Sequence, residues 1–331
     1  MERFISIVIP NYNGSATIGR CIEAALASAY AHFEVIVVDD CSTDGSVEII
    51  TQYPCRLIRL SRHGGASKAR NTGAFHSKGD ILFFTDADCL LTPDALSVAG
   101  AIIAEKGTAV VVGGTYTPLP YDKGFYSMFQ SVFINYSELK HADAPDYIAT
   151  HALAIDAQVF RTSGGFAEEF LPILEDVEFS HRLRSRGYTL MMSPHLLVQH
   201  IFNYSLGASL RNAMRKTAYW VLYSLRNRDL FADSGTASLE LKFNGFIYLI
   251  MLSLIVFGIA TGKGIAAAFV LALLLLAANG TVSRALLAAF LRAGGKLFAL
   301  KATAYYMLVY PAAIWIGVIV GMKKYLLGKH E

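Results

Sequence analysis

Charged residues are scarce in this chain: only 17% of its 331 residues are Asp, Glu, Lys or Arg, whereas 54% are hydrophobic. The mean hydropathy of +0.41 is too high for an ordinary soluble enzyme. The shortage is uneven, because residues 1–233 mix charges, turns and short apolar runs, whereas apolar stretches with basic breaks dominate after Lys242. We therefore expect a soluble domain over residues 1–233 and a membrane region over residues 234–331.

Cysteine is also rare, and its four occurrences all fall in the first 89 residues: Cys21, Cys41, Cys55 and Cys89. None of them forms a C-x-x-C pair or has a histidine at ligand spacing. This usage is typical of reduced, buried thiols in a cytoplasmic domain. The chain runs from Met1 directly into a strand-like stretch without the pattern of a signal peptide, so we expect the N-terminal domain to face the cytoplasm. There is no internal repeat or low-complexity stretch.

The excess of positive charge is small, with a net charge of +3. The basic residues cluster late in the chain, at Arg211, Arg215, Lys216, Arg226 and Arg228, around Arg284–Lys301, and at Lys323, Lys324 and Lys329. This pattern suits an anionic membrane surface better than nucleic acid, and we expect no nucleic-acid partner. Residues 205–230 combine basic and aromatic side chains, which favours helices lying on the membrane surface. The alternative is an ordinary helix packed beneath a sheet.

Three stretches are apolar enough for membrane helices, residues 243–260, 265–282 and 303–322. A spanning helix needs roughly 20 such residues. Three full spans would place the C-terminal lysines outside the cell, against the usual bias of basic loops toward the cytoplasm. One stretch is therefore expected to be re-entrant or interfacial, and Pro311 makes the last one suspect. Buried helices of a large soluble core are the alternative for all three.

The N-terminal part alternates short apolar runs with segments of helical periodicity. The expected strands are Ser6–Ile9, Glu34–Asp40, Arg56–Leu60, Asp80–Thr85 and Ala109–Val112, and the expected helices include Ile18–Ala29, Ser42–Ile50, Ala66–Ser77 and Glu175–Arg186. Repeated βα units predict a parallel, doubly wound sheet covered on both faces. Residues 116–147 have no clear assignment. Ligands of such sheets bind at the carboxyl ends of strands, so Asp39-Asp40 and Asp86-Ala87-Asp88 are expected to share one crevice.

Asp86 and Asp88 flank one small residue after a buried strand. In extended backbone both carboxylates would point to the same side. Their hard oxygen atoms suit Mg²⁺ or Mn²⁺, which a nucleotide diphosphate would also help to bind. The alternative is a solvated turn and helix cap ahead of Thr92-Pro93.

Five motifs follow one another along the chain: Ser6–Asn13, Val37–Ser46, Gly65–Gly73, Phe84–Asp88, and Gly164-Gly165-Phe166 with Leu174–Glu178. In this order, from Ser6 to Arg186, they resemble the family 2 glycosyltransferases. The resemblance implies their A-type fold, an α/β architecture in which two Rossmann-like halves form one mostly parallel sheet. Here an α-helical transmembrane region follows it, a layout similar to that of the polyprenyl-phosphate glycosyltransferases.

The resemblance also implies residues that bind the nucleotide-sugar donor: Pro10, Tyr12, Asp39, Asp40, Lys68, Arg70, Asn71 and Asp86. In the family pattern Asp40, with Asp39, contacts the base, and Pro10 and Tyr12 wall the base pocket. The segment from Lys68 to Asn71 would lie near the phosphates or stabilise the loop. The alternatives are that Asp40 caps the next helix and that the cations of this segment are solvated.

Asp176 matches the catalytic base of the family, and one carboxylate that takes the acceptor proton during in-line attack gives inversion. Glu175 would position the acceptor or Asp176. Both could instead be first-turn acids that the helix dipole favours. The metal ligands implied are Asp86, Asp88 and His200, although a lone histidine is more often structural.

Two departures from the family pattern bear on the acceptor. The Gln-x-x-Arg-Trp motif of processive polysaccharide synthases is not present as such, and Cys89-Leu90-Leu91 replaces the Leu-Gln-His that is usual in dolichol-phosphate-mannose synthases. The sequence therefore predicts an inverting, metal-dependent glycosyltransferase that moves a sugar from a UDP- or GDP-sugar to a lipid or lipid-linked acceptor at the membrane. A processive synthase and a non-catalytic nucleotide-binding membrane subunit stay as alternatives. The sequence leaves the sugar, the base, the acceptor and the oligomeric state open.

Overall fold

A computed structural model describes residues 2–169, 173–230, 232–262 and 264–328 of the chain. The chain divides into two compact units, an N-terminal unit of residues 1–123 and 138–203 and a C-terminal unit of residues 124–137 and 204–331. The chain therefore enters the C-terminal unit for the last time after residue 203, thirty residues before the functional boundary expected at residue 233. That functional boundary stays a prediction.

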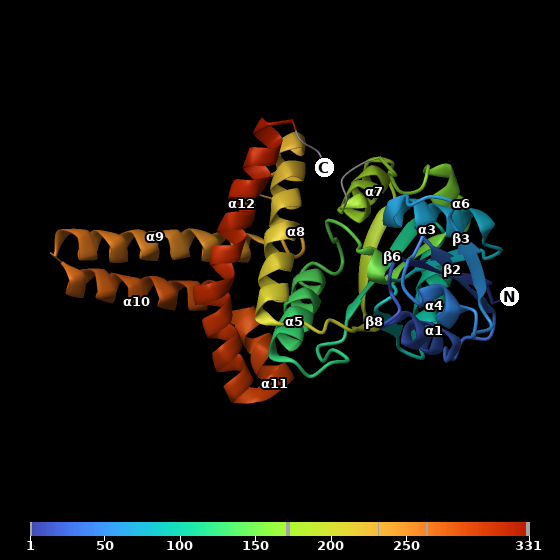
Figure 1. Ribbon diagram of the computed structural model, residues 1–331, viewed down its shortest axis with the longest axis horizontal. Coiled ribbons are helices and arrows are strands. Elements are labelled where there is room, and N and C mark those ends of the chain that lie inside the picture. The colour runs from blue at the N-terminus through green and yellow to red at the C-terminus, as the bar shows by residue number, and fades with distance from the viewer. Residues whose placement is uncertain (1, 170–172, 231, 263, 329–331) are drawn as a thin grey trace. The chain divides into compact units, whose positions relative to one another are not determined.

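The N-terminal unit alternates strands and helices, as the periodicity predicted (Figure 1). Its strands are β1 Ile5–Asn11, β2 Phe33–Asp39, β3 Arg56–Arg59, β4 Ile81–Phe84, β5 Cys89–Leu91, β6 Val110–Tyr116, β7 Leu153–Asp156 and β8 Thr189–His200. Its helices are α1 Ile18–Leu26, α2 Ser46–Ile50, α3 Gly65–His76, α4 Ala95–Lys106, η1 Thr150–Ala152, α6 Ala157–Thr162 and α7 Glu175–Ser185. The predicted strands and helices of the first 85 residues all form, with shifts of a few residues at their ends.

The eight strands form one sheet in the order β3-β2-β1-β4-β7-β6-β8-β5. The pairs β1–β2, β1–β4, β2–β3 and β6–β8 are parallel, whereas β4–β7, β6–β7 and β5–β8 are antiparallel. The sheet is thus mixed but mostly parallel, which confirms the predicted fold class. Strands β5 and β8 were not predicted, because β5 has only three residues and the residues that pair the two lie far apart in the sequence.

Helices cover both faces of the sheet because side chains alternate along each strand. On β1, Val8 faces a core cluster that also includes Ala74 of α3, Phe160 of α6 and Phe179 of α7. Ile5 of the same strand is an odd number of positions from Val8 and therefore points to the opposite face, toward α4. Its Cδ1 lies 3.8 Å from the position that a Cβ on Gly100 would take. The strands are therefore buried from both sides, and their carboxyl ends stay available for polar residues.

The C-terminal unit is helical. Its helices are α5 Phe125–Leu139, α8 Leu206–Asn227, α9 Leu239–Thr261, α10 Ile265–Val282, α11 Arg284–Ala304, the π-helical segment η2 Tyr305–Val309 and α12 Tyr310–Leu326. Helix α5 ends just beyond the unit's first segment and lies in the stretch that had no assignment. Helix α11 was also not predicted, because the sequence was interpreted there as a basic break. Gly295 divides α11 with a φ of 72°.

Three stretches are long and apolar enough to cross a membrane, namely α9, α10 and residues 284–326. They contain the three expected stretches. In Figure 1, α9 and α10 lie side by side as a hairpin that runs across the direction of the neighbouring helices α8 and α12. In the most apolar stretch of α10, only 6% of the residues are buried, whereas 50% are buried in the most apolar stretch of residues 284–326. Within this unit the helices of the hairpin therefore expose more of their apolar side chains, whereas residues 284–326 pack more of theirs against other helices.

The close approach of α3 to the sheet depends on Gly73. A Cβ at this position would lie 2.4 Å from Val8 Cγ1 and 3.2 Å from Val38 Cγ2. We expect Gly73→Ala to destabilise the protein by about 1–3 kcal/mol, because overpacking outweighs the better helix propensity of alanine. Thermal unfolding of the full chain in detergent, followed by intrinsic fluorescence, measures this loss.

The matched control is Gly45→Ala, since a Cβ on Gly45 meets no atom within 4 Å. This variant should unfold close to the wild-type temperature. A Gly73→Ala protein as stable as Gly45→Ala would contradict the close packing of α3 on β1 and β2.

Candidate active site

Arg70 joins three elements at the carboxyl end of the sheet. Its Nη2 donates to Asp86 Oδ1 and its Nη1 to Glu175 Oε1, both at 2.6 Å. Arg70 comes from α3, Asp86 follows β4, and Glu175 begins α7. The arginine is 4% exposed and Glu175 9%. A buried charge of this kind is tolerated only when it is paired and hydrogen-bonded. Arg70 is thus buried and not a solvated cation, and its predicted role, near the phosphates or in stabilising the loop, stays a prediction.

The two aspartates of the DxD segment have pKa values that are shifted in opposite directions. Burial works to raise the pKa of Asp86, but the Arg70 guanidinium, helped by His151 and His200, holds that pKa below its usual value. Burial raises the pKa of Asp88; His200 opposes this shift, and the charge of Asp86 adds to it. The two carboxylates therefore differ in chemistry although they are two residues apart.

Glu175 and Asp176 open helix α7, whose first turn also holds Glu178. The residue before them, Leu174, has a φ of 77°, a left-handed backbone that costs a non-glycine residue about 1–3 kcal/mol. This turn starts the helix so that its first carboxylate meets Arg70. Glu175 is held by that bond, whereas Asp176 is less buried and its Oδ1 accepts from the N–H of Val177 at 2.9 Å. Asp176, the predicted catalytic base, thus directly follows Glu175, whose carboxylate is held by Arg70.

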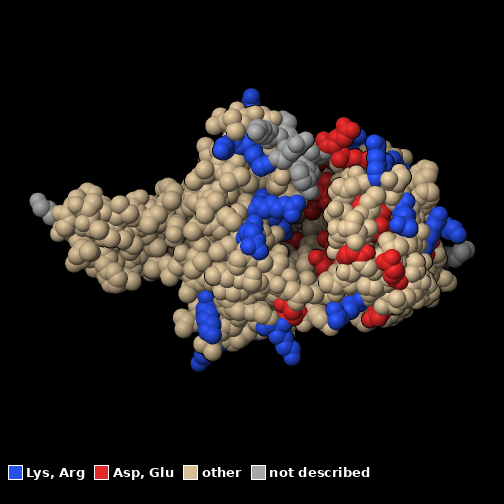
Figure 2. Space-filling view, in the orientation of Figure 1, with Lys and Arg blue, Asp and Glu red and all other residues tan. Residues whose placement is uncertain are grey.

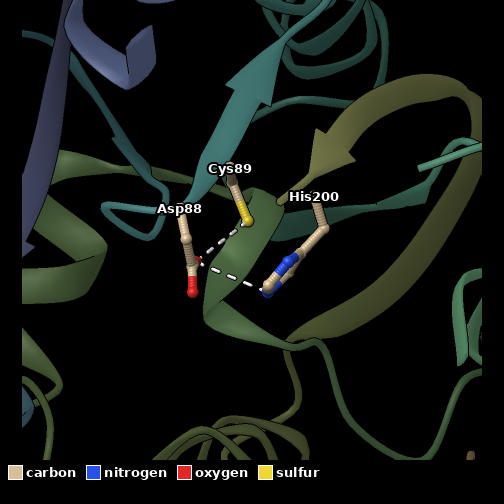
Figure 3. Close-up of side chains that lie close together, drawn as sticks. All are labelled: Asp88, Cys89 and His200. Atoms are coloured by element: carbon tan, nitrogen blue, oxygen red, sulfur yellow. Dashed lines mark hydrogen bonds and ion pairs between the residues drawn. The ribbon is translucent and has the colours of Figure 1, made fainter. Parts of the chain in front are cut away.

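Asp88, Cys89 and His200 come together because β5 and β8 pair (Figure 3). Cys89 lies opposite His200 in the antiparallel register. His200 Nε2 lies 3.5 Å from Asp88 Oδ1, and the Cys89 thiol lies 3.8 Å from the same oxygen. A turn closed by the Cys89 N–H and the Asp86 carbonyl at 3.1 Å separates the two aspartates, so that each has its own partner. The three ligand atoms lie within 4.8 Å of one another.

The chemistry of these atoms fits a hard divalent cation. Burial, with the charges of Asp88 and Asp86, raises the pKa of the Cys89 thiol well above its usual value. Without a bound metal the thiol is therefore protonated, and a metal would have to displace that proton to bind the sulfur. An aspartate oxygen and an imidazole nitrogen remain, a set that suits Mg²⁺ or Mn²⁺ better than a thiolate metal such as zinc. Cys89 was not among the predicted site residues, and its adjacency depends on the strand pairing.

Aromatic side chains pack against the His200 ring and orient it. Its ring stacks on Phe202 with centroids 3.8 Å apart and planes 8° apart, and it meets the edge of Tyr116 at 5.0 Å. Tyr116 stacks in turn on His151, whose Nε2 lies 3.4 Å from a carboxylate oxygen of Glu138. No sequence signal pointed to this layer, because its members come from separate elements. It restricts the imidazole to one orientation, as the surroundings of ligand histidines usually do.

A second cluster lies at the carboxyl end of β2. Asp40 is 2% exposed, and its two carboxylate oxygens accept from the N–H groups of Gly64 and Gly65 at 2.7 Å each. His63 Nδ1 lies 2.9 Å from Asp40 Oδ2, and the His63 ring packs on Tyr12 with centroids 4.4 Å apart. Asp40 therefore anchors the start of α3 together with His63, which the sequence did not single out. Tyr12 is 53% exposed and presents an aromatic face beside it.

The remaining predicted donor residues hold backbone segments. Asp39 is 1% exposed and accepts from Asn11 Nδ2 at 2.9 Å and from the N–H of Ser42 at 3.1 Å. Pro10 is partly buried within β1. Since β1 lies between β2 and β4 in the sheet, Asp39 and Asp86 belong to the same edge.

Lys68 and Asn71 bind the loop that follows α6. Asn71 donates to the carbonyl of Phe166 at 2.8 Å and accepts from its N–H at 2.9 Å. Lys68 Nζ lies 3.0 Å from Glu168 Oε2. Gly165 adopts a φ of 64°, and a Cβ there would lie 2.6 Å from Asn71 Oδ1, so the Gly-Gly-Phe motif suits this contact. Helix α3 thus positions two neighbouring segments, one through Arg70 and one through Asn71.

Residues 6–154 match the protein family described as Glycosyl transferase family 2. The chain contains a family 2 glycosyltransferase domain. The match includes the strands β1–β4 and the DxD segment, and it ends before Glu175, Asp176 and His200. The roles of the predicted site residues are therefore still predictions, and so is the identity of the metal.

Relatives of this glycosyltransferase domain occur in bacteria and archaea. Glycosyltransferase GlyG of Streptococcus pneumoniae is 32% identical over 131 residues, which cover 38% of this chain and 44% of that protein. Glycosyltransferase AglE of Haloferax volcanii is 27% identical over 240 residues, which cover 69% of this chain and 78% of that protein. The chain thus spans less than half the length of the first relative and about three quarters of the second.

The fold is that of the A-type glycosyltransferases. The structure of the mannosyltransferase PcManGT from Pyrobaculum calidifontis, in complex with GDP-mannose and Mn²⁺, aligns with a TM-score of 0.61 at 20% identity. The alignment covers 99% of this chain and 88% of that one. At this identity the likeness establishes the architecture alone.

The Arg70 bridge predicts a large stability effect. Arg70→Met would leave Asp86 and Glu175 without their cation, and removing one partner of a buried ion pair typically costs about 3–5 kcal/mol. The double variant Arg70→Met/Glu175→Gln should recover part of this loss, since only one carboxylate is then unpaired. The change is measured as the midpoint of thermal unfolding in detergent.

Arg62→Met is the control, because Arg62 is exposed in the turn before α3, and a surface substitution of this kind usually changes stability by about 0.5 kcal/mol or less. If Arg70→Met unfolded at the temperature of Arg62→Met, the bridge would not be a main support of the site.

Proposed function

We propose that this chain is an inverting, metal-dependent glycosyltransferase that moves a sugar from a UDP- or GDP-sugar to a lipid or lipid-linked acceptor at the membrane. One observation carries the proposal: Arg70 joins the DxD residue Asp86 to Glu175, next to the predicted base Asp176. A donor-side carboxylate and an acceptor-side carboxylate are therefore held together at one end of a glycosyltransferase sheet. A purely structural role would not need such acids gathered there.

On the donor side, Tyr12 and His63 offer aromatic faces for the nucleotide base. Asp39 accepts a hydrogen bond from the backbone N–H of Ser42, and Asp40 accepts from those of Gly64 and Gly65, so the two aspartates hold the loop after β2 and the start of α3. The proposal also includes a direct contact of Asp40 with the nucleotide base. Asp88 and His200, with Asp86 beside them, would hold Mg²⁺ or Mn²⁺, which supplies positive charge for the leaving diphosphate.

On the acceptor side, Asp176 takes the proton from the acceptor hydroxyl as that oxygen attacks the anomeric carbon. Attack from the face opposite the leaving diphosphate inverts the anomeric configuration in a single step. Glu175 stays bound to Arg70 and so fixes the first turn of α7, which positions Asp176. Arg70 also keeps Asp86 ionised, since its charge lowers the pKa of that carboxyl.

The membrane part of the proposal depends on the α9–α10 hairpin. Figure 2 shows its described surface without a Lys, Arg, Asp or Glu side chain over most of its length. If α9 and α10 alone cross the bilayer, both ends of the hairpin lie on one side of it. Lys323 and Lys324 are then on the same side of the bilayer as the N-terminal unit. This topology agrees with the bias of basic residues toward the cytoplasm and removes the conflict that three spans create. A cytoplasmic catalytic unit would then meet a lipid acceptor at the surface.

The metal role predicts a loss of metal-dependent donor affinity. Asp88→Ala removes the carboxylate that faces His200, so titration calorimetry of UDP and GDP should lose the gain in affinity that Mn²⁺ gives to the wild type, a loss of tenfold or more. Glu105→Gln is the control, because Glu105 is exposed on α4 and pairs only with Lys106 among the described residues. An unchanged Mn²⁺ effect in Asp88→Ala would exclude Asp88 as a ligand.

The base assignment predicts a selective loss of turnover. Asp176→Asn keeps the shape of the side chain but cannot accept the proton, so we expect transfer to fall by at least 100-fold while donor affinity stays within about twofold, since general-base catalysis typically contributes 10²–10⁴-fold. Transfer is measured in membranes with labelled nucleotide sugars and a lipid extract, and product length separates a single transfer from polymer synthesis.

Glu178→Gln is a matched control in the same helical turn, since the Glu178 carboxylate pairs with Arg182 instead. It should keep most of the activity. Near-normal transfer by Asp176→Asn would mean that another group is the base. No transfer and no donor hydrolysis by the wild type, with nucleotide binding intact, would favour the non-catalytic subunit.

A further inference from the structure

The C-terminal unit contains a cavity of about 730 Å³. Its walls come from α5, α8, the first turns of α9, and α12, and most of its lining is apolar, with Trp220, Phe243 and Val318 among the contributors. The lining on α8 extends from Ala213 to Leu225, which corresponds to about 18 Å at the rise of 1.5 Å per residue. The cavity is therefore an elongated apolar groove, and its volume is within the usual range for ligand sites.

The groove contains a polar atom that lacks a protein partner. Gln130 of α5 lines the cavity and is 2% exposed, and its amide oxygen has no hydrogen-bond partner among the described residues. An unpaired buried acceptor costs about 1–3 kcal/mol, so this position favours a ligand that donates a hydrogen bond. Asp229 Oδ1 also has no partner among the described residues, but Asp229 is only half-buried and follows the C-terminal end of α8.

The net charge of the lining does not favour an ionic ligand. Two lysines and two acids face the groove, namely Lys216, Lys242, Asp229 and Glu240. Lys242 donates to the carbonyl of Ala232, and Glu240 accepts from the Tyr136 hydroxyl. The charges balance, and two of the four already have partners. The recognition chemistry is therefore mostly apolar, and Gln130 supplies a hydrogen-bond acceptor from a fully buried side chain.

The position of the groove selects the kind of ligand. It lies at the base of the α9–α10 hairpin, because the first residues of α9 and Val282 at the end of α10 both line it. Phe246 of α9 and Met322 of α12 line it as well, and they are 58% and 49% exposed. The rim of the groove thus continues into the apolar surface that a bilayer would cover.

We infer that this groove binds one membrane lipid, with a hydrocarbon chain along α8 and α12 and a hydroxyl of its polar part donating to the Gln130 amide oxygen. A chain that leaves the bilayer for an apolar groove loses little hydrophobic stabilisation. The hydroxyl removes the cost of the unpaired acceptor, which favours hydroxyl-bearing lipids. This inference does not depend on the proposed transfer reaction, and its test contains no sugar donor.

The experiment uses the full chain in bilayer nanodiscs of phosphatidylcholine. A small fraction of either phosphatidylglycerol or phosphatidylcholine carries a diazirine in one acyl chain, and the cross-linked residues are mapped by mass spectrometry. Phosphatidylglycerol has hydroxyl groups in its polar part, whereas phosphatidylcholine has none. We expect the phosphatidylglycerol probe to label the groove residues of α8 and α12 at least threefold more than the other probe. Gln130→Leu should remove this preference.

Two substitutions on α12 test the groove itself. Val318→Trp fills it and should reduce labelling of α8 at least threefold, whereas Ile319→Trp, at a 64% exposed position that does not line it, should not. Labelling of the exposed face of α10 reports insertion, and Val318→Phe replaces any variant that loses this labelling. Equal labelling by the two probes, or labelling of α8 unchanged in the filled variant, would overturn the inference and leave only ordinary bilayer contact.

Discussion

The site depends on one buried cation. Arg70 is surrounded by protein, and the free energy of burying its charge is recovered only because Asp86 and Glu175 both accept from it. The pairing ties the end of β4 to the start of α7 across a helix that packs tightly on the sheet. Because α3 also holds Asp40 through its first N–H groups and the Gly-Gly-Phe loop through Asn71, a single helix sets the positions of the loop after β2, the DxD segment and the start of α7.

Strand pairing decides the rest of the site. The antiparallel pairing of β5 with β8 places His200 beside Asp88, although 112 residues separate them in the sequence. The Tyr116, His151 and Phe202 rings then restrict the imidazole. The mixed sheet matters here, because a purely parallel sheet would bring the start of β5 to the opposite edge from the end of β8. The departure from the expected parallel pattern is thus the feature that completes the candidate metal centre.

The C-terminal unit follows a different rule, since the surface of its α9–α10 hairpin is apolar and buried polar groups near it must find partners inside the unit. Asn244 donates to the carbonyl of Tyr306 at 2.8 Å, and Asn279 donates to the Asn244 amide oxygen at 2.6 Å. Both asparagines are buried, and the bond from Asn244 satisfies a carbonyl of the π-helical segment before α12. Such side chains re-pair backbone groups that an irregular helix releases. The amide oxygen of Gln130 is an exception to this rule, as are Asp229 Oδ1 and the Tyr306 hydroxyl, since none of the three has a hydrogen-bond partner among the described residues.

The sequence by itself determined the element types of the first half, the α/β class and the apolar stretches, because these depend on local periodicity and on composition. It also marked the acids at strand ends, since a carboxylate that directly follows a buried strand must lie at the carboxyl edge of the sheet. Tertiary structure alone decided which partner each acid has: Arg70 for Asp86 and Glu175, His200 for Asp88, and backbone N–H groups for Asp40. It likewise placed His63 and Cys89 in the site and put helices α5 and α11 where no pattern predicted them. These contacts join residues far apart in the chain, and long-range pairing depends on strand register and burial, which no local pattern encodes.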